Sequence, residues 1–162
     1  MRNESGQATV IELALILPVL LAFLFGVVDY GRVMHARNTL VNAARAGART
    51  AVLTPGLLPQ SSTAVGSGSS TTAVAVAGAL APLQNSDGTV PPSITYQISL
   101  ANAGGRSVTG AAQPGNQVTV TVNYGQFPMI TPLNAMLAML INGQPQGSNQ
   151  LSISGQAVMR YD

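Results

Sequence analysis

The ionisable side chains of this chain are few, and they restrict the chemistry it could perform. Its 162 residues include seven Arg, five Asp or Glu and one His, with no Lys and no Cys. Without Cys there is no thiol nucleophile, disulfide or thiolate metal site. Without Lys there is no phosphate-binding loop of the Walker type and no Schiff-base chemistry. No base is positioned to serve the Ser and Asp residues, so we expect no enzymatic activity, no metal site and no cofactor.

Glu12 has the most informative setting of these residues. It lies in the run Val10–Val28, where it is the only charge and Pro18 is the only proline. A carboxylate inside an apolar span is costly and usually has a partner. Two interpretations are open: Glu12 lies at the lipid headgroup boundary, or it pairs with a cation on a neighbouring chain.

The run that carries Glu12 has the length of a membrane helix. Its 19 residues, at 1.5 Å each, give about 28 Å, close to the hydrocarbon thickness of a bilayer. The alternatives are a buried core helix and a cleaved secretory signal ending at Ala36. The run is long for the core of so small a domain, and charged residues intervene before Ala36. We therefore favour a membrane span.

The helical pattern continues beyond this run. No proline occurs from Asp29 to Leu53, small apolar residues recur on one face, and polar residues occupy the opposite face. The predicted packing face contains Ala36, Leu40, Ala43, Gly47 and Ala51. Small residues allow a partner backbone to approach closely. This face either covers the chain's own sheet or packs against other subunits of a filament.

The remaining chain predicts loops, short strands and short helices. Residues 54–70 are rich in Pro, Gly, Ser and Thr and predict a flexible loop, and residues 101–116 predict another. We expect helices over 71–83 and 131–141, although residues 73–77 also alternate like a strand. We expect strands over 94–100 and 118–122, and a final strand over 151–159 with a bulge at Gly155. The predicted fold class is α+β, with a long N-terminal transmembrane and amphipathic helix packed on a small antiparallel sheet, a pilin-like arrangement.

The N-terminal motifs resemble a known family. Gly6-Gln7-Ala8, Glu12-Leu13 and the segment Asn42–Arg49 are similar to those of the TadE-like minor pilins, or pseudopilins, of the tight-adherence (Tad/Flp) pilus system. The resemblance implies that a prepilin peptidase cleaves after Gly6, which makes Gln7 the first residue. It also implies that Glu12 acts in subunit assembly by neutralising the amine of an adjacent subunit. The related TadF-like proteins share this pattern, so the branch is left open.

This resemblance implies a membrane-anchored structural subunit for pilus assembly in the bacterial envelope. Its expected partners are membrane lipid, the prepilin peptidase, other pilin or pseudopilin subunits and the pilus assembly machinery. A net charge of +2 gives no reason to expect nucleic acid. The expected segments are a leader over 1–6, a transmembrane helix over 7–28, its amphipathic continuation over 29–53, the loop 54–70 and an exported domain over 71–162.

Two departures from the family pattern keep an alternative open. Five residues separate Gly6 from Glu12, where the prepilin pattern has four. The family arrangement places the chain once through the inner (cytoplasmic) membrane with a cytoplasmic N-terminus and a periplasmic C-terminal domain. Arg residues are nevertheless more numerous after the span than before it, which the positive-inside rule would assign to the cytoplasm. The alternative is an uncleaved, single-pass binding or adhesion module that never enters a filament.

Overall fold

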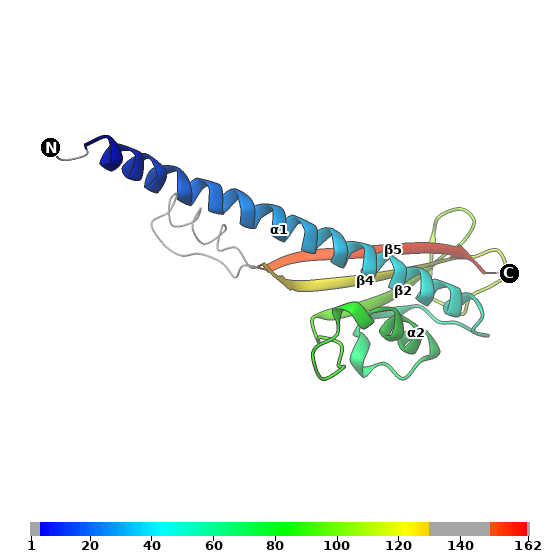
Figure 1. Cartoon of the computed structure of the whole chain (residues 1–162). Coiled ribbons are helices and arrows are strands. Elements are labelled where there is room, and N and C mark those ends of the chain that lie inside the picture. Colours follow the sequence, from blue (N-terminus) through cyan, green and yellow to red (C-terminus); the bar gives the residue numbers. More distant parts are fainter. Residues whose placement is uncertain (1–3, 130–149, 162) are drawn as a thin grey trace. The chain divides into compact units, whose positions relative to one another are not determined.

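The structure, a computed structural model, describes residues 4–129 and 150–161 (Figure 1). In chain order the elements are α1 (Glu4–Val52), β1 (Gln60–Ala64), the short 3-10 helix η1 (Val65–Ser67), α2 (Thr71–Ala79), a second 3-10 helix η2 (Ala81–Leu83), β2 (Ile94–Ala101), β3 (Ser107–Val108), β4 (Gln117–Pro128) and β5 (Gln150–Arg160). Contacts divide the described residues into two compact units: residues 4–33 with 128–129 and 150, and residues 34–127 with 151–161.

The first unit contains the apolar stretch of α1. Its large apolar side chains between Val10 and Val28 range from 40% exposed at Leu21 to 77% exposed at Leu15. The helix continues through Pro18. Among the described residues, α1 is long and apolar enough to cross a membrane, as judged by length and composition. The core helix of a soluble domain would bury these side chains. The prediction of a long N-terminal apolar helix is confirmed.

The second unit is built on an antiparallel sheet with the strand order β1-β2-β4-β5, and β3 pairs with β2. Strands β2 and β4 pair along the whole of β2, from Ile94 opposite Tyr124 to Ala101 opposite Gln117. Strands β4 and β5 also run antiparallel. Ser152 bonds to Asn123 at one end of this pair, and the backbone of Tyr161 bonds to that of Asn116 at the other. The predicted α+β class is therefore confirmed.

One face of the sheet forms the core. Alternate residues of β2 and β4 are at most 2% exposed: Ile94, Tyr96, Ile98, Leu100, Val118, Val120 and Val122. This alternation with Thr, Ser and Gln is what a strand with one buried face requires. Burying a Val, Leu or Ile side chain stabilises a fold by about 1.5–3 kcal/mol. These strands therefore supply a continuous apolar surface for a helix.

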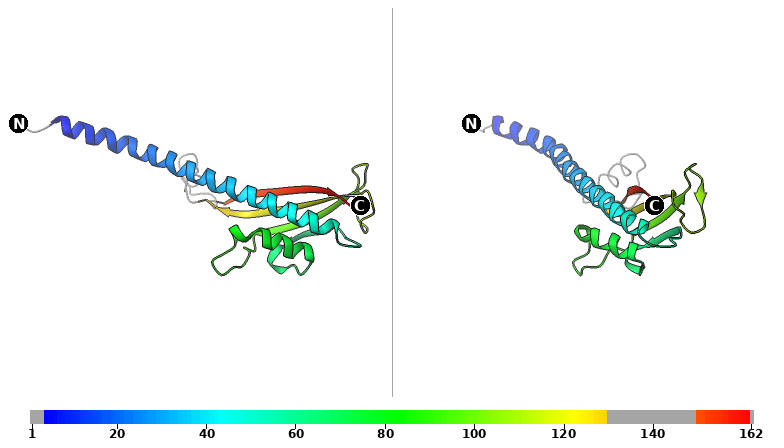
Figure 2. Two further views of the ribbon diagram at one scale, coloured as in Figure 1. Left: turned by 45° about the vertical axis from the view of Figure 1, so that its right-hand side comes forward. Right: turned by 90° about the vertical axis from the view of Figure 1, so that its right-hand side faces the viewer.

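The part of α1 from Met34 onward lies against this surface, and α2 lies beside it (Figure 2). A Cβ built on Gly47 would lie 2.6 Å from Cγ2 of Val76 in α2 and 3.2 Å from Cγ1 of Val120 in β4. At Gly155 the strand backbone meets the helix backbone directly, because an added Cβ would collide with Leu40 and Val41. Because Gly155 has no side chain, β5 and α1 pack closely at this point.

Several elements differ from the sequence prediction. Strand β1 lies within residues 54–70, where we predicted a loop, and β3 lies within the predicted loop 101–116. Strand β4 extends well beyond the predicted range 118–122, and α2 ends at Ala79 before the 3-10 helix η2. The predicted helix over 131–141 lies outside the described residues.

Candidate functional site

Glu12 lies on the exposed apolar stretch of α1. Its neighbours along the helix are apolar and exposed, with Ile11 70% and Leu13 62% accessible. Among the described residues no cation forms an ion pair with Glu12. A carboxylate in this position is costly to place in hydrocarbon unless a neighbouring chain or the headgroup region solvates it. The geometry is compatible with both interpretations drawn from the sequence.

Gly6 and Gln7 lie near the start of α1, whose backbone is helical from Glu4. Glu12 is six helical residues after Gly6, whereas the prepilin pattern would place the acidic residue five after it. One additional residue turns the carboxylate by about 100° around the axis and moves it about 1.5 Å along it. The helix is regular from Gly6 to Glu12, so nothing in the backbone compensates for this rotation and rise.

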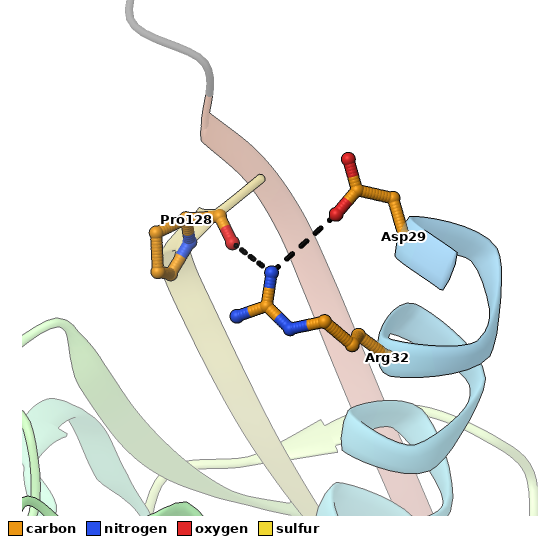
Figure 3. Close-up of polar contacts among 3 residues, drawn as sticks. All are labelled: Asp29, Arg32 and Pro128. Atoms are coloured by element: carbon orange, nitrogen blue, oxygen red, sulfur yellow. Dashed lines mark hydrogen bonds and ion pairs between the residues drawn. The ribbon is translucent and has the colours of Figure 1, made fainter. Parts of the chain in front are cut away.

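Asp29 and Arg32 form an ion pair immediately after the apolar stretch (Figure 3). Nη1 of Arg32 lies 3.4 Å from Oδ1 of Asp29, one turn earlier on the same helix, and donates a hydrogen bond of 3.2 Å to the carbonyl oxygen of Pro128. Asp29 is only 2% exposed. A carboxylate withdrawn from water to this degree needs a cation or donors to offset its lost hydration.

This arrangement ties the end of the apolar stretch to the end of β4. Because the Arg32 side chain is 36% exposed, solvent screens the pair and its net contribution is modest, within about 1 kcal/mol. Asp29 and Arg32 are among the charges that follow the apolar run in the sequence. Their spacing of three residues on a helix allows an ion pair, whereas nothing in the sequence indicated the burial of Asp29.

The predicted packing face is covered by the chain itself. Its side chains Ala36, Leu40, Ala43 and Ala51 are fully buried, and Gly47 is buried against α2 and β4. Of the two roles left open for this face, covering the chain's own sheet is the one that the geometry provides. His35, Arg45 and Arg49 lie on the exposed side.

Sequence reasoning missed the part that Gly155 plays in this contact. The structure places Gly155 against the backbone of Leu40. A glycine inside an alternating strand pattern is compatible with a bulge, with a close backbone approach, or with both. The close approach is observed, and the bulge at Gly155 stays a prediction.

The described part of the chain offers no evident metal centre. No group of three or more His, Cys, Asp or Glu side chains within residues 4–129 and 150–161 is placed to hold a metal ion. The features that stand out are instead the exposed apolar stretch of α1, the single carboxylate of Glu12 within it, and the buried small-residue face of the later part of α1.

Comparison with known proteins adds a family to this geometry. The model of the family described as TadE-like protein matches residues 6–49, a stretch that includes Gly6, Gln7, Glu12 and most of the packing face. No curated protein and no solved structure matches the chain. The match confirms the TadE-like resemblance over these residues. The matched residues lie within α1 and include its apolar stretch.

Proposed function

We propose, from the premise that residues 6–49 are TadE-like, that this protein is a minor pilin or pseudopilin that helps assemble a Tad/Flp-type pilus. The observation that carries the proposal is the coincidence of this match with an α1 stretch whose apolar side chains are exposed. The role is structural rather than catalytic. Its surroundings are membrane lipid first and then the helices of other pilin subunits.

The mechanism follows from the two environments that such side chains accept. In the membrane, lipid tails surround Val10–Val28, and the helix backbone satisfies its own hydrogen bonds. In an assembled pilus, neighbouring apolar helices replace the lipid, and close packing supplies the attraction. Glu12 favours this exchange if it meets a cation on an adjacent subunit, because pairing offsets the cost of a carboxylate in apolar surroundings.

We place the chain in the inner membrane with its N-terminus in the cytoplasm and its C-terminal domain, residues 71–162, outside. The Arg distribution alone would favour the reverse orientation. Long domains, however, are translocated largely regardless of their charge. A fusion of alkaline phosphatase after residue 162 tests the orientation: it should be active, and an inactive fusion that is full length would contradict this topology.

The proposal includes processing by a prepilin peptidase between Gly6 and Gln7. The intact mass of the protein, from cells with and without the peptidase, tests it. Loss of residues 1–6 only when the peptidase is present would support a pseudopilin with Gln7 at its N-terminus. An uncut chain would favour a permanent anchor, and a cut near Ala36 would make the protein a secreted soluble domain.

The second candidate is a single-pass anchored binding or adhesion module. The additional residue between Gly6 and Glu12 favours it, because a simple anchor needs neither cleavage nor a placed carboxylate. Pilus number in a strain lacking the chromosomal copy distinguishes the two. Glu12→Ala should abolish pili, and Ile11→Ala at the neighbouring exposed position should not. Normal pili in both Glu12→Ala and a Gly6 substitution would refute the pilin mechanism.

A further inference from the structure

Three arginines form an exposed cationic row on the later part of α1. Arg37, Arg45 and Arg49 are all exposed, and the described residues provide no hydrogen bond or ion pair to any of them. At 100° per residue they fall within an arc of about 120°. They extend about 18 Å along the axis. We call these three residues the arginine row.

The row carries charge of one sign only. No Asp or Glu occurs between residues 30 and 53, and the polar side chains between the arginines include Asn38 and Asn42. Like charges four residues apart, such as Arg45 and Arg49, weaken a helix slightly. The row therefore does not stabilise α1, and the opposite face already holds the helix on its sheet.

A second copy of this chain is a poor match for the row. The sequence contains five carboxylate side chains. Glu4 and Glu12 lie at the start of α1, and Asp29 is buried beside Arg32. The chain after Asp29 contains only Asp87 and Asp162, against six arginines at positions 32, 37, 45, 49, 106 and 160. Copies juxtaposed through this part of the chain would bring cations onto cations, which disfavours a complex.

A lipid surface fits the row no better. The row runs along the helix axis for more than twice the Debye length, which is about 8 Å at physiological salt. The helix continues from Arg37 toward the apolar stretch. Anionic headgroups at the end of that stretch would reach the Arg37 end of the row at most. Arg45 and Arg49 need a partner that extends alongside α1.

We propose that the arginine row binds the acidic face of a different protein subunit, whose Asp or Glu side chains repeat along an element lying beside α1. Charge complementarity of this kind selects one partner and rejects others, including a second copy of the same chain. The inference rests on the proposed function, since it names the kind of neighbour that a pilus subunit of this type takes. It makes the assembly heterotypic at this face.

Site-specific photo-crosslinking in pilus-forming cells tests the proposal with the full-length protein. A photoreactive residue at Asn42, which is exposed beside the row, should give an adduct with another protein whose crosslinked peptide contains more than one Asp or Glu. The double substitution Arg45→Gln and Arg49→Gln should lower the yield about fivefold, the effect expected for two interfacial ion pairs of modest strength.

Matched variants distinguish an effect of the arginine row on the adduct yield from an effect of net charge or of misfolding. Arg106→Glu changes the net charge by the same amount at another exposed site and should leave the yield unchanged. The pair Arg45→Lys and Arg49→Lys keeps the charge and should retain the adduct. Arg45→Glu with Arg49→Glu should lose the adduct, and placing Lys at the acidic positions of the crosslinked peptide should restore it.

Four results would overturn the inference: an adduct of this chain with itself, an adduct with lipid alone, no adduct, or a yield that the Gln double variant leaves unchanged. Pilus number in the same cells distinguishes this failure from that of the proposed function. If pili form without this protein, the pilus role fails. If pili need the protein but the adduct ignores Arg45 and Arg49, only the arginine row is refuted.

Discussion

The two stretches of α1 differ in the size of their apolar side chains and in what surrounds them. Between Val10 and Val28 the side chains are mostly large and exposed, with Leu20 59% accessible. Between Ala36 and Ala51 the inward residues are mostly Ala or Gly and are buried, with Leu40 the largest. Large side chains suit a fluid surrounding that fills any gap, whereas small ones suit another backbone that must approach closely. The size of the apolar side chains along α1 therefore indicates whether a fluid or a packed backbone surrounds each stretch.

The largest expected effect comes from replacing one leucine in each stretch of α1 and comparing the losses of stability. Leu40→Ala removes buried methyl groups and leaves a cavity, so it should lower the free energy of unfolding by about 3 kcal/mol. Leu20→Ala should change it by less than about 0.5 kcal/mol. Denaturant unfolding of the full chain in nanodiscs, followed by tyrosine fluorescence, measures both. Equal losses would mean that the two stretches share one kind of environment.

A charge in the exposed stretch tests the membrane side of the comparison. Leu20→Arg should raise the free energy of membrane insertion by roughly 2.5 kcal/mol, since a cation at a helix centre is poorly tolerated in hydrocarbon. The fraction of protein that resists alkaline extraction from membranes reports this change, and Leu20→Ile is the control. Full retention of the Arg variant would argue that Val10–Val28 does not lie in the bilayer.

Gly155→Ala sharpens the comparison on the domain side. The new Cβ would collide with the backbone of Leu40 and Val41, which cannot move aside as a flexible side chain would. We expect a loss of about 2 kcal/mol in the free energy of unfolding. Gly110→Ala, where an added Cβ meets no atom within 4 Å, is the matched control. A loss of the same size in both variants would remove the case for close helix–sheet contact.

The smallest effect concerns Asp87, an exposed residue far in sequence from both stretches. A hydrogen bond from the side chain of Thr89, and then one from its backbone N–H, lowers the pKa of Asp87 from its ordinary 3.8. A lowered pKa contributes stability that is complete above the ordinary value and is lost as the pH falls through the lowered one. Asp87→Asn should therefore reduce the pH dependence of unfolding only below about pH 4.

An NMR titration of the Asp87 carboxyl carbon provides the direct measurement. Thr89→Val should return the pKa toward 3.8. A titration that is the same with and without the Thr89 hydroxyl would show that the hydrogen bond contributes nothing. Because both residues are far in sequence from α1, neither variant should affect the membrane behaviour of Val10–Val28.

The sequence predicted the elements whose apolar pattern is regular. Alternation identified β2 and β4, and the residues of the small-residue face of α1 are buried in the structure. The sequence did not predict strand β1, because Gln60–Ala64 is polar and has no alternating apolar face. It forms because β2 offers it an edge with which to pair. The local sequence pattern therefore predicts a strand that has an alternating apolar face. It does not predict a polar strand that forms by pairing with the edge of another strand.

The residues of the candidate site also fall into one that the sequence indicated and others that it did not. Glu12 was evident because a single carboxylate in an apolar run needs no structure to be noticed. The burial of Asp29 and the bond from Arg32 to Pro128 were not evident, since the partner lies 96 residues away in sequence. Long-range contacts of this kind depend on the register of β4 relative to α1, which neither segment specifies alone.

The contact of β5 with α1 has a consequence for how the chain is made. The hydroxyl of Tyr161 donates to the carbonyl of Thr54 across 107 residues, and Gly155 lies against Leu40. Closing loops of this length is a late event in folding, because the contacts that reward it do not exist until both ends are present. The domain cannot be completed until residues 150–161 have left the ribosome. Until then the part of α1 around Leu40 lacks the strand that lies against it.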